Sequence, residues 1–193
     1  MVELENAFIT LRFLTEQHRE ILRPLAKDDR IWEYTKTLML TDTYDQQFDW
    51  YFNDALGFAA KGGQAFVIGD PADDRIIGMT RVYDLDPKAK RATIGHTWYI
   101  PGVWGKVHNK ACKLLLLDYL FADGRLNRVD FKVAGHNIRS QKAVLKIGGV
   151  REGILRQYVL RNDGTLTDTH YFSILAAEWP EKKEKLQELI ASY

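Results

Sequence analysis

The chain has 193 residues, of which 46% are hydrophobic and 27% charged, and its net charge is +1. This is the composition of an ordinary globular protein that can bury one substantial core, so we expect a single domain over residues 1–193. The lone Cys112 excludes an intrachain disulfide and a cysteine-rich zinc site, and it favours a reducing, cytoplasmic compartment. The balanced charge gives no strong signal for nucleic-acid binding, and no apolar run is long enough to span a membrane.

The first half of the chain predicts a strand, two helical segments and an antiparallel meander. A β-rich run opens it, Thr15 introduces a helical stretch, and apolar residues then recur with the helical period. Gly/Asp/Pro-rich turns separate the strands that follow. The predicted elements are a strand at 8–14, helices after Thr15 and at 44–60, and strands at 65–68, 76–83 and 92–100.

The second half predicts helices and strands in alternation. Asn109 is the expected cap of a helix whose apolar stripe includes Cys112 and Leu116, and Gly124 ends it. A strand at 128–133, a helix at 137–147, a hairpin of strands at 154–160 and 167–174 around residues 162–164, and a charged helix at 181–190 follow. The order indicates an α+β protein whose mixed sheet carries helices on its faces.

The junction between the strand at 92–100 and the next helix is a candidate anion site. Free backbone N–H groups and the positive end of the helix dipole meet there, and Lys106, His108 and Lys110 add donors suited to phosphate. A pyrophosphate would fit this chemistry. The alternative is a connection whose cations are only solvated.

Several motifs further along the chain occur together in one known family. They are Asn137-Ile138-Arg139-Ser140, the run from Lys146 to Arg156, Asp168, and Glu178-Trp179-Pro180. In this order and spacing, with the Trp-Gly of residues 104–105, they resemble the GCN5-related N-acetyltransferases (GNAT), in the branch similar to ribosomal-protein N-terminal acetyltransferases. The resemblance runs from about Phe8 to Pro180.

The resemblance implies a V-shaped, mostly antiparallel seven-stranded sheet that splays between the strands at 92–100 and 128–133. It implies acetyl-CoA as co-substrate, with no metal. Its pantetheine arm would pair with backbone at Trp98, Tyr99 and Ile100, and Ser140 would give the departing thiolate a proton or hydrogen bond. Asn137 would hold the pantetheine or a water. The pyrophosphate would meet the loop of Trp104, Gly105, Lys106, Val107, His108 and Asn109.

Three positions depart from the family pattern, two in the pyrophosphate loop and one on the strand before it. Small residues usually let the pyrophosphate loop approach the phosphates, but Val107 and Asn109 stand at those positions. We therefore expect an altered cofactor loop, and the alternative is a loss of cofactor binding. Thr93 stands where a glutamate base is common. His96, Glu152 or a chain of waters is then left to deprotonate the amine.

The sequence therefore predicts a cytoplasmic acetyltransferase that acts by direct attack in a ternary complex. The acceptor is a primary amine, at a protein N-terminus or similar. The alternatives are a small-molecule amine such as a polyamine, amino acid or antibiotic, or a non-catalytic CoA-binding protein. A homodimer is also considered, and no membrane partner is expected.

Overall fold

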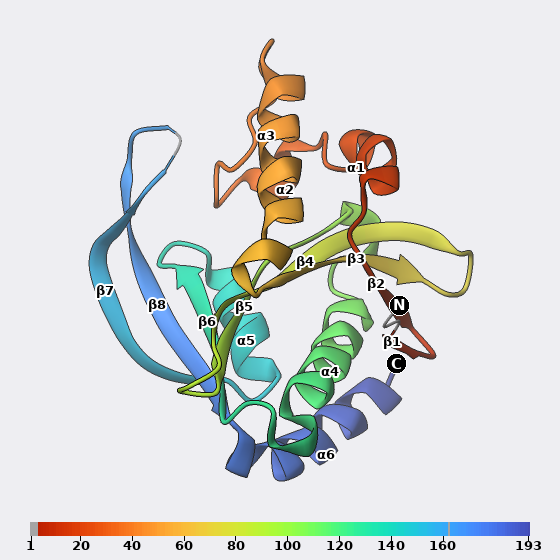
Figure 1. Cartoon of the computed structure of the whole chain (residues 1–193), viewed down its shortest axis with the longest axis vertical. Coiled ribbons are helices and arrows are strands. Elements are labelled where there is room, and N and C mark those ends of the chain that lie inside the picture. Colours follow the sequence, from red (N-terminus) through yellow and green to blue (C-terminus); the bar gives the residue numbers. More distant parts are fainter. Residues whose placement is uncertain (1–3, 162) are drawn as a thin grey trace.

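The computed structural model describes residues 4–161 and 163–193, and these form one mixed sheet with helices on both faces (Figure 1). The described residues contribute eight strands in the order β1-β2-β3-β4-β5-β6-β8-β7. The strands are β1 (Leu4–Asn6), β2 (Ile9–Phe13), β3 (Gln64–Asp70), β4 (Arg75–Asp86), β5 (Arg91–Tyr99), β6 (Arg128–Ala134), β7 (Val150–Leu160) and β8 (Leu166–Leu175). The helices are α1 (Arg19–Leu25), α2 (Asp29–Trp32), α3 (Tyr44–Gly57), α4 (His108–Phe121), α5 (Ile138–Lys146) and α6 (Trp179–Ala191).

Neighbouring strands are antiparallel except at one position. β5 and β6 run parallel, and they pair over only three residues of each strand, 91–93 with 128–130. The remainder of β5 continues away from β6, as the resemblance predicts. Beyond the pairing at Thr93, the inner edge of β5 therefore has no partner strand among the described residues.

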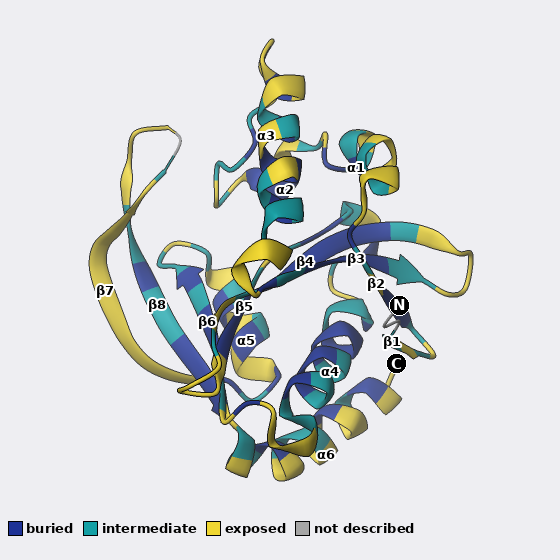
Figure 2. Ribbon diagram, viewed as in Figure 1, coloured by how far each residue is buried: buried dark blue, intermediate teal, exposed yellow. Residues whose placement is uncertain are grey.

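Two hydrophobic cores lie on opposite faces of the sheet. One joins α4 and α6 to the inward residues of the strands, among them Ile68, Val129 and Ile174. The other joins α1, α2 and α3 to residues such as Met79 and Trp98. Figure 2 shows this layering as buried strands between helices, whereas β7 is exposed along its whole length.

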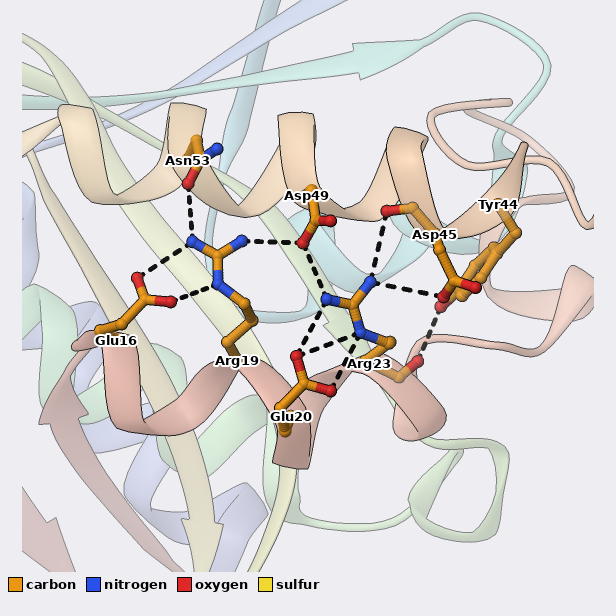
Figure 3. Close-up of polar contacts among 8 residues, drawn as sticks. All are labelled: Glu16, Arg19, Glu20, Arg23, Tyr44, Asp45, Asp49 and Asn53. Atoms are coloured by element: carbon orange, nitrogen blue, oxygen red, sulfur yellow. Dashed lines mark hydrogen bonds and ion pairs between the residues drawn. The ribbon is translucent and has the colours of Figure 1, made fainter.

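Helices α1 and α3 are joined by a network of ion pairs (Figure 3). Arg19 and Arg23, four residues apart on α1, both donate to Asp49 of α3, at 2.9 and 2.8 Å. Each guanidinium also lies over a phenylalanine ring of α3. The remaining partners of the two arginines are Glu16, Glu20, the Asp45 side chain and carbonyl, and Asn53.

The mixed α+β class is confirmed, and the strand count differs by one. The additional strand, β1, has three residues, too few for an alternating pattern to be visible in the sequence. Asn6 Oδ1 accepts from the backbone of Phe8 and Ile9 and closes the turn into β2. The one-turn helix α2 was also not predicted; it begins at Asp29, and the side chain of the capping residue Asp28 accepts from Arg30 N.

Most other predicted boundaries differ by a few residues. Helix α4 begins at His108, so Asn109 lies inside its first turn and is not the cap. The hairpin strands β7 and β8 are confirmed, but Asn162 of the predicted turn lies outside the described residues. None of the described helices has the length and apolar character to cross a bilayer.

Candidate active site in the cleft between β5 and β6

The cleft begins where β5 and β6 separate. A β-bulge lies at this point of β5: Met79 of β4 pairs with Trp98 and Arg81 with Gly95, so Thr80 faces both His96 and Thr97. His96 has a left-handed backbone (φ 48°), which is uncommon for a side-chain-bearing residue. Because a bulge bends its strand and strengthens its twist, this feature directs β5 away from β6.

A cavity of about 530 Å³ occupies the opening. Its walls come from β5, the loop before α4, the first turns of α4, β6 and α5. Most of the predicted cofactor residues line it, namely Trp98, Tyr99, Trp104, Gly105, Lys106, Asn109, Asn137 and Ser140. The fold thus brings residues from separate motifs to one place.

Three predicted cofactor residues do not line the cavity. Val107 is 7% exposed and packs in the core beneath α4, which explains why an apolar residue occupies this position of the loop. His108 turns towards Asp70 of β3, with Nε2 and Oδ2 3.2 Å apart. Ile100 donates its backbone N–H to Ile77 O on the β4 side.

Lysines gather at the end of the cavity near the N-terminus of α4. Lys106 and Lys110 come from the loop and the first turn of the helix, and Lys142 and Lys146 come from α5 on the opposite wall. Neither lysine of α5 was predicted as a cofactor residue, although Lys146 opens one of the family motifs, because only the fold brings α5 to face α4. Together with the free N–H groups of the helix, these side chains form a positively charged region suited to phosphate.

Asn137 and Ser140 are coupled through the first turn of α5. Asn137 caps the helix, its Oδ1 accepting from Ser140 N at 3.0 Å. Both residues line the cavity. The cap fixes the start of the helix that presents Ser140 to the cleft.

His96 lies on the α3 side of the bulge and is open to the cavity. The rings of Phe58 and Tyr83 pack near it, with centroids 6.2 and 5.2 Å away. Desolvation by this aromatic environment, together with the nearby Arg81 guanidinium, lowers the pKa of His96 to about 4. The imidazole is therefore neutral at pH 7 and a weak base.

Glu152 lies outside the cavity. Its carboxylate accepts two hydrogen bonds from Arg128, at 2.8 and 2.6 Å, and one from Ser173 at 2.5 Å. These donors lower the pKa of Glu152, so it is ionised and fully engaged in bracing β7 against its neighbours. This position does not suit a base that must reach an amine in the cleft.

Three further contacts fix tryptophans at or beside the cleft, and the sequence did not reveal them. The Arg139 guanidinium of α5 lies over the Trp104 ring, 4.2 Å from its centroid, and so joins the two arms of the V. Trp104 Nε1 in turn donates to Tyr99 O at 2.8 Å, which occupies one backbone acceptor on β5. On the opposite face of the sheet, Trp98 Nε1 donates to Tyr51 OH at 3.1 Å.

A splayed mixed sheet, a bulge at the splay and a cationic helix N-terminus beside it define an acyl-CoA-dependent transferase. Residues 9–150 match the family model described as acetyltransferase (GNAT) domain. The chain therefore belongs to the GNAT family and is an N-acetyltransferase, and this family uses acetyl-CoA.

Individual relatives agree with this assignment. The chain is 29% identical to "Putative ribosomal N-acetyltransferase YdaF" of Bacillus subtilis, over 92% of this chain and 97% of that protein. A GCN5-related N-acetyltransferase from Brucella melitensis has the same fold, with a TM-score of 0.86, 22% identity and coverage of 98% and 85% of the two chains. RimL, a ribosomal L7/L12 alpha-N-protein acetyltransferase crystallised with coenzyme A, has a TM-score of 0.75, 17% identity and coverage of 90% and 98%.

Proposed function

We propose that this N-acetyltransferase transfers acetyl from acetyl-CoA to the α-amine at the N-terminus of a protein. The observation that carries the cofactor part is the continuity of one cavity. It joins the lysines around the N-terminus of α4, the unpaired inner edge of β5, and Ser140. In this arrangement the pyrophosphate lies against Lys106, Lys110 and the helix N-terminus, and the pantetheine follows β5 towards the bulge.

The chemistry needs few side chains. The neutral amine attacks the acetyl carbon, the carbon–nitrogen bond forms, and the carbon–sulfur bond breaks with its electron pair moving to sulfur. Backbone N–H groups of β5 at the splay polarise the thioester carbonyl, and Ser140 donates to the departing thiolate. The low pKa of His96 favours water as the carrier of the proton from the amine, with His96 as the second candidate.

A second cavity favours a polypeptide acceptor. It has a volume of about 650 Å³ and adjoins the first through Lys132, which lines both. Asp84, Asp86 and Asp130 give it carboxylates, and Tyr171 belongs to the β7–β8 hairpin. Together the two cavities offer more room than a small amine would fill. The names of YdaF and RimL support a ribosomal protein as one acceptor to test.

The acceptor is tested by thiol release with a matched panel. Each candidate acceptor is mixed with the enzyme and acetyl-CoA. The candidates are peptides with free N-termini, the same peptides with blocked N-termini, a polyamine, amino acids and an aminoglycoside. We expect release only with free N-terminal peptides and a mass increase on the α-amine. Transfer to a small amine alone would support the second acceptor class, and CoA binding without product from any amine would support a non-catalytic role.

We also propose that two copies pair through the exposed edge of β7. This strand presents unpaired backbone groups and apolar side chains, including Ile154, Leu155 and Leu160. Antiparallel pairing of two β7 strands about a two-fold axis would cover both edges at once. Light scattering during gel filtration should give the mass of a dimer, and Leu155→Lys should give that of a monomer.

We propose one domain and a reducing, cytoplasmic location for the chain. A single sheet passes through the described residues, and α6 packs on α4. Cys112, the one cysteine, is buried, and burial raises the pKa of its thiol, so it is poorly reactive.

A further inference from the structure

Lys113 is a buried cation with little to balance it. It lies on α4, is 5% exposed, and donates from Nζ to Thr97 Oγ1 at 2.8 Å. Within residues 4–161 and 163–193 this is its one hydrogen bond, and no carboxylate lies within ion-pair distance. An ammonium has three donors, and burying an unpaired charge is costly. Burial accordingly lowers the pKa of Lys113.

The side chain lines the cleft on the side of β5. Lys113 lines the cavity one turn beyond Asn109 on the same face of α4, about 6 Å further along the axis. Its partner Thr97 lies on β5 beyond Thr93, the last residue that pairs with β6. This is the splay, where the thioester lies under the proposed function. The end of the cavity near the N-terminus of α4 has its own lysines, Lys106 and Lys110.

Lys110, three residues before Lys113 on α4, makes different contacts. Its Nζ donates to Lys106 O at 3.2 Å and to Tyr193 OH at 2.7 Å, and it lies over the Tyr193 ring. Lys110 therefore belongs to the end of the cavity proposed for the phosphates. Lys113, directed to the bulge, is placed for a different part of the ligand.

We propose that Lys113 is a catalytic residue whose ammonium stabilises the negative charge that develops on the CoA sulfur. As the carbon–sulfur bond breaks, its electron pair moves to sulfur, and Lys113 donates a hydrogen bond to the thiolate while keeping its proton. The proton of the attacking amine leaves through water. This role rests on the proposed function only in placing the thioester at the splay.

Thr97 is the positioning residue for this charge. Its Oγ1 accepts from Lys113 and lies 2.7 Å from Oγ1 of the fully buried Thr80. The hydroxyls of Thr97 and Thr80 also share a hydrogen bond, in which either oxygen can be the donor. The chain of hydroxyls fixes Nζ at the wall of the cleft.

The direct test is a titration of the CoA thiol bound to the enzyme, followed by the ultraviolet absorbance of the thiolate, with no acceptor present. Lys113→Met should lower the ratio of thiolate to thiol about tenfold at a given pH, and Lys113→Arg should restore most of it. Lys110→Met, the matched control, should weaken CoA binding and leave the thiol pKa unchanged. An unchanged thiol pKa in saturated Lys113→Met would overturn the proposal, whatever its CoA affinity.

Stability and turnover give an independent readout. Removal of a costly buried charge should leave the melting temperature of Lys113→Met equal or higher, while kcat falls about tenfold or more. A merely structural tether predicts a lower melting temperature and an unchanged chemical step, which would count against the proposal. If Lys113→Met does not fold, the thiol of bound CoA is titrated in the same way in Thr97→Val and Lys113→Arg. Because the titration needs no acceptor, a wrong acceptor assignment leaves its result unaffected.

Discussion

Ser140 is the side chain on α5 that we expect to matter most as the thioester breaks. Its backbone N–H holds the Asn137 cap, so Ser140→Ala removes the hydroxyl and keeps that hydrogen bond. We expect kcat to fall about tenfold or more with little change in CoA affinity. Steady-state kinetics together with calorimetry of CoA binding measure both.

Asn137→Ala provides the comparison for Ser140. Loss of the cap should cost about 1 kcal/mol of stability and should affect CoA binding as well as turnover. Equal kcat for wild type and Ser140→Ala, measured where chemistry limits the rate, would exclude the hydroxyl as the donor.

The neutral state of His96 makes a prediction about pH. With its pKa lowered to about 4, His96 does not change charge between pH 6 and 9. For a peptide acceptor, kcat/KM should rise with pH through the pKa of the α-amine, about 7.7–8.0, and for a lysine-like amine through about 10.4. The profile should keep its shape in His96→Ala.

A histidine acting as base would give a different profile. Activity would then rise with pH through about 4, and His96→Ala would abolish that limb. Glu152→Gln is the control, since Glu152 is engaged with Arg128 away from the cavity, and it should not alter the pH profile.

At the scale of elements, Asp49 holds α1 and α3 together. Its side chain is 46% exposed, so each ion pair is screened and weak, but it serves two arginines at once (Figure 3). Asp49→Asn should lower the free energy of unfolding by about 1 kcal/mol, as measured by urea denaturation. Asp45→Asn, at a more exposed position with a longer 3.4 Å contact, should cost less.

The free energy of unfolding lost in Asp49→Asn should decrease as the pH falls. Hydrogen bonds from Arg23 and Arg19 lower the pKa of Asp49 below 3.8, its ordinary value. A carboxyl whose pKa is lowered on folding stabilises the protein above its unfolded pKa, and this contribution disappears as pH falls through the folded value. The difference between wild type and Asp49→Asn should therefore vanish in acid; a constant difference would assign the effect to packing.

Helices and strands long enough to repeat their hydrophobic pattern were predictable from the sequence. Short elements, and features imposed by tertiary contacts, were not. The stripe that includes Cys112 and Leu116 predicted α4, because a four-turn amphipathic helix repeats its signal. β1 and α2 have three and four residues and carry no such repeat. The bulge at His96 was invisible, because its left-handed backbone is imposed by pairing with β4 and not by a glycine.

For the whole molecule, the cleft joins parts that are distant in sequence. The family resemblance gave roles to Asn137, Ser140 and the loop before α4. It gave none to Lys142, Lys146 or Arg139, whose roles depend on α5 facing α4 across the cavity. Lys113 was not among the site residues predicted from the sequence. Its burial and single hydrogen bond required the packing of α4 on β5.

Cofactor binding should stabilise the whole fold. A ligand that bridges α4, β5 and α5 binds only the folded chain, so CoA at about 100 times its Kd should add ~2.7 kcal/mol to the free energy of unfolding. Differential scanning fluorimetry with CoA, and with adenosine as a control lacking the pyrophosphate, measures the effect. An unchanged Tm at millimolar CoA would contradict this cofactor site.

The contact between Arg139 and Trp104 also makes the cleft an optical reporter of its own occupancy. A guanidinium 4.2 Å from an indole influences its fluorescence, and we expect pantetheine that enters between the two arms to disturb that contact. Mixing with CoA should therefore change the emission, and Trp104→Phe should remove the change, whereas the exposed Trp50→Phe should retain it. If separation of the arms precedes binding, the observed rate should level off at high CoA, and Arg139→Ala should abolish that plateau. The time that the cofactor needs to enter and leave would then be readable from one side chain, without any acetyl transfer.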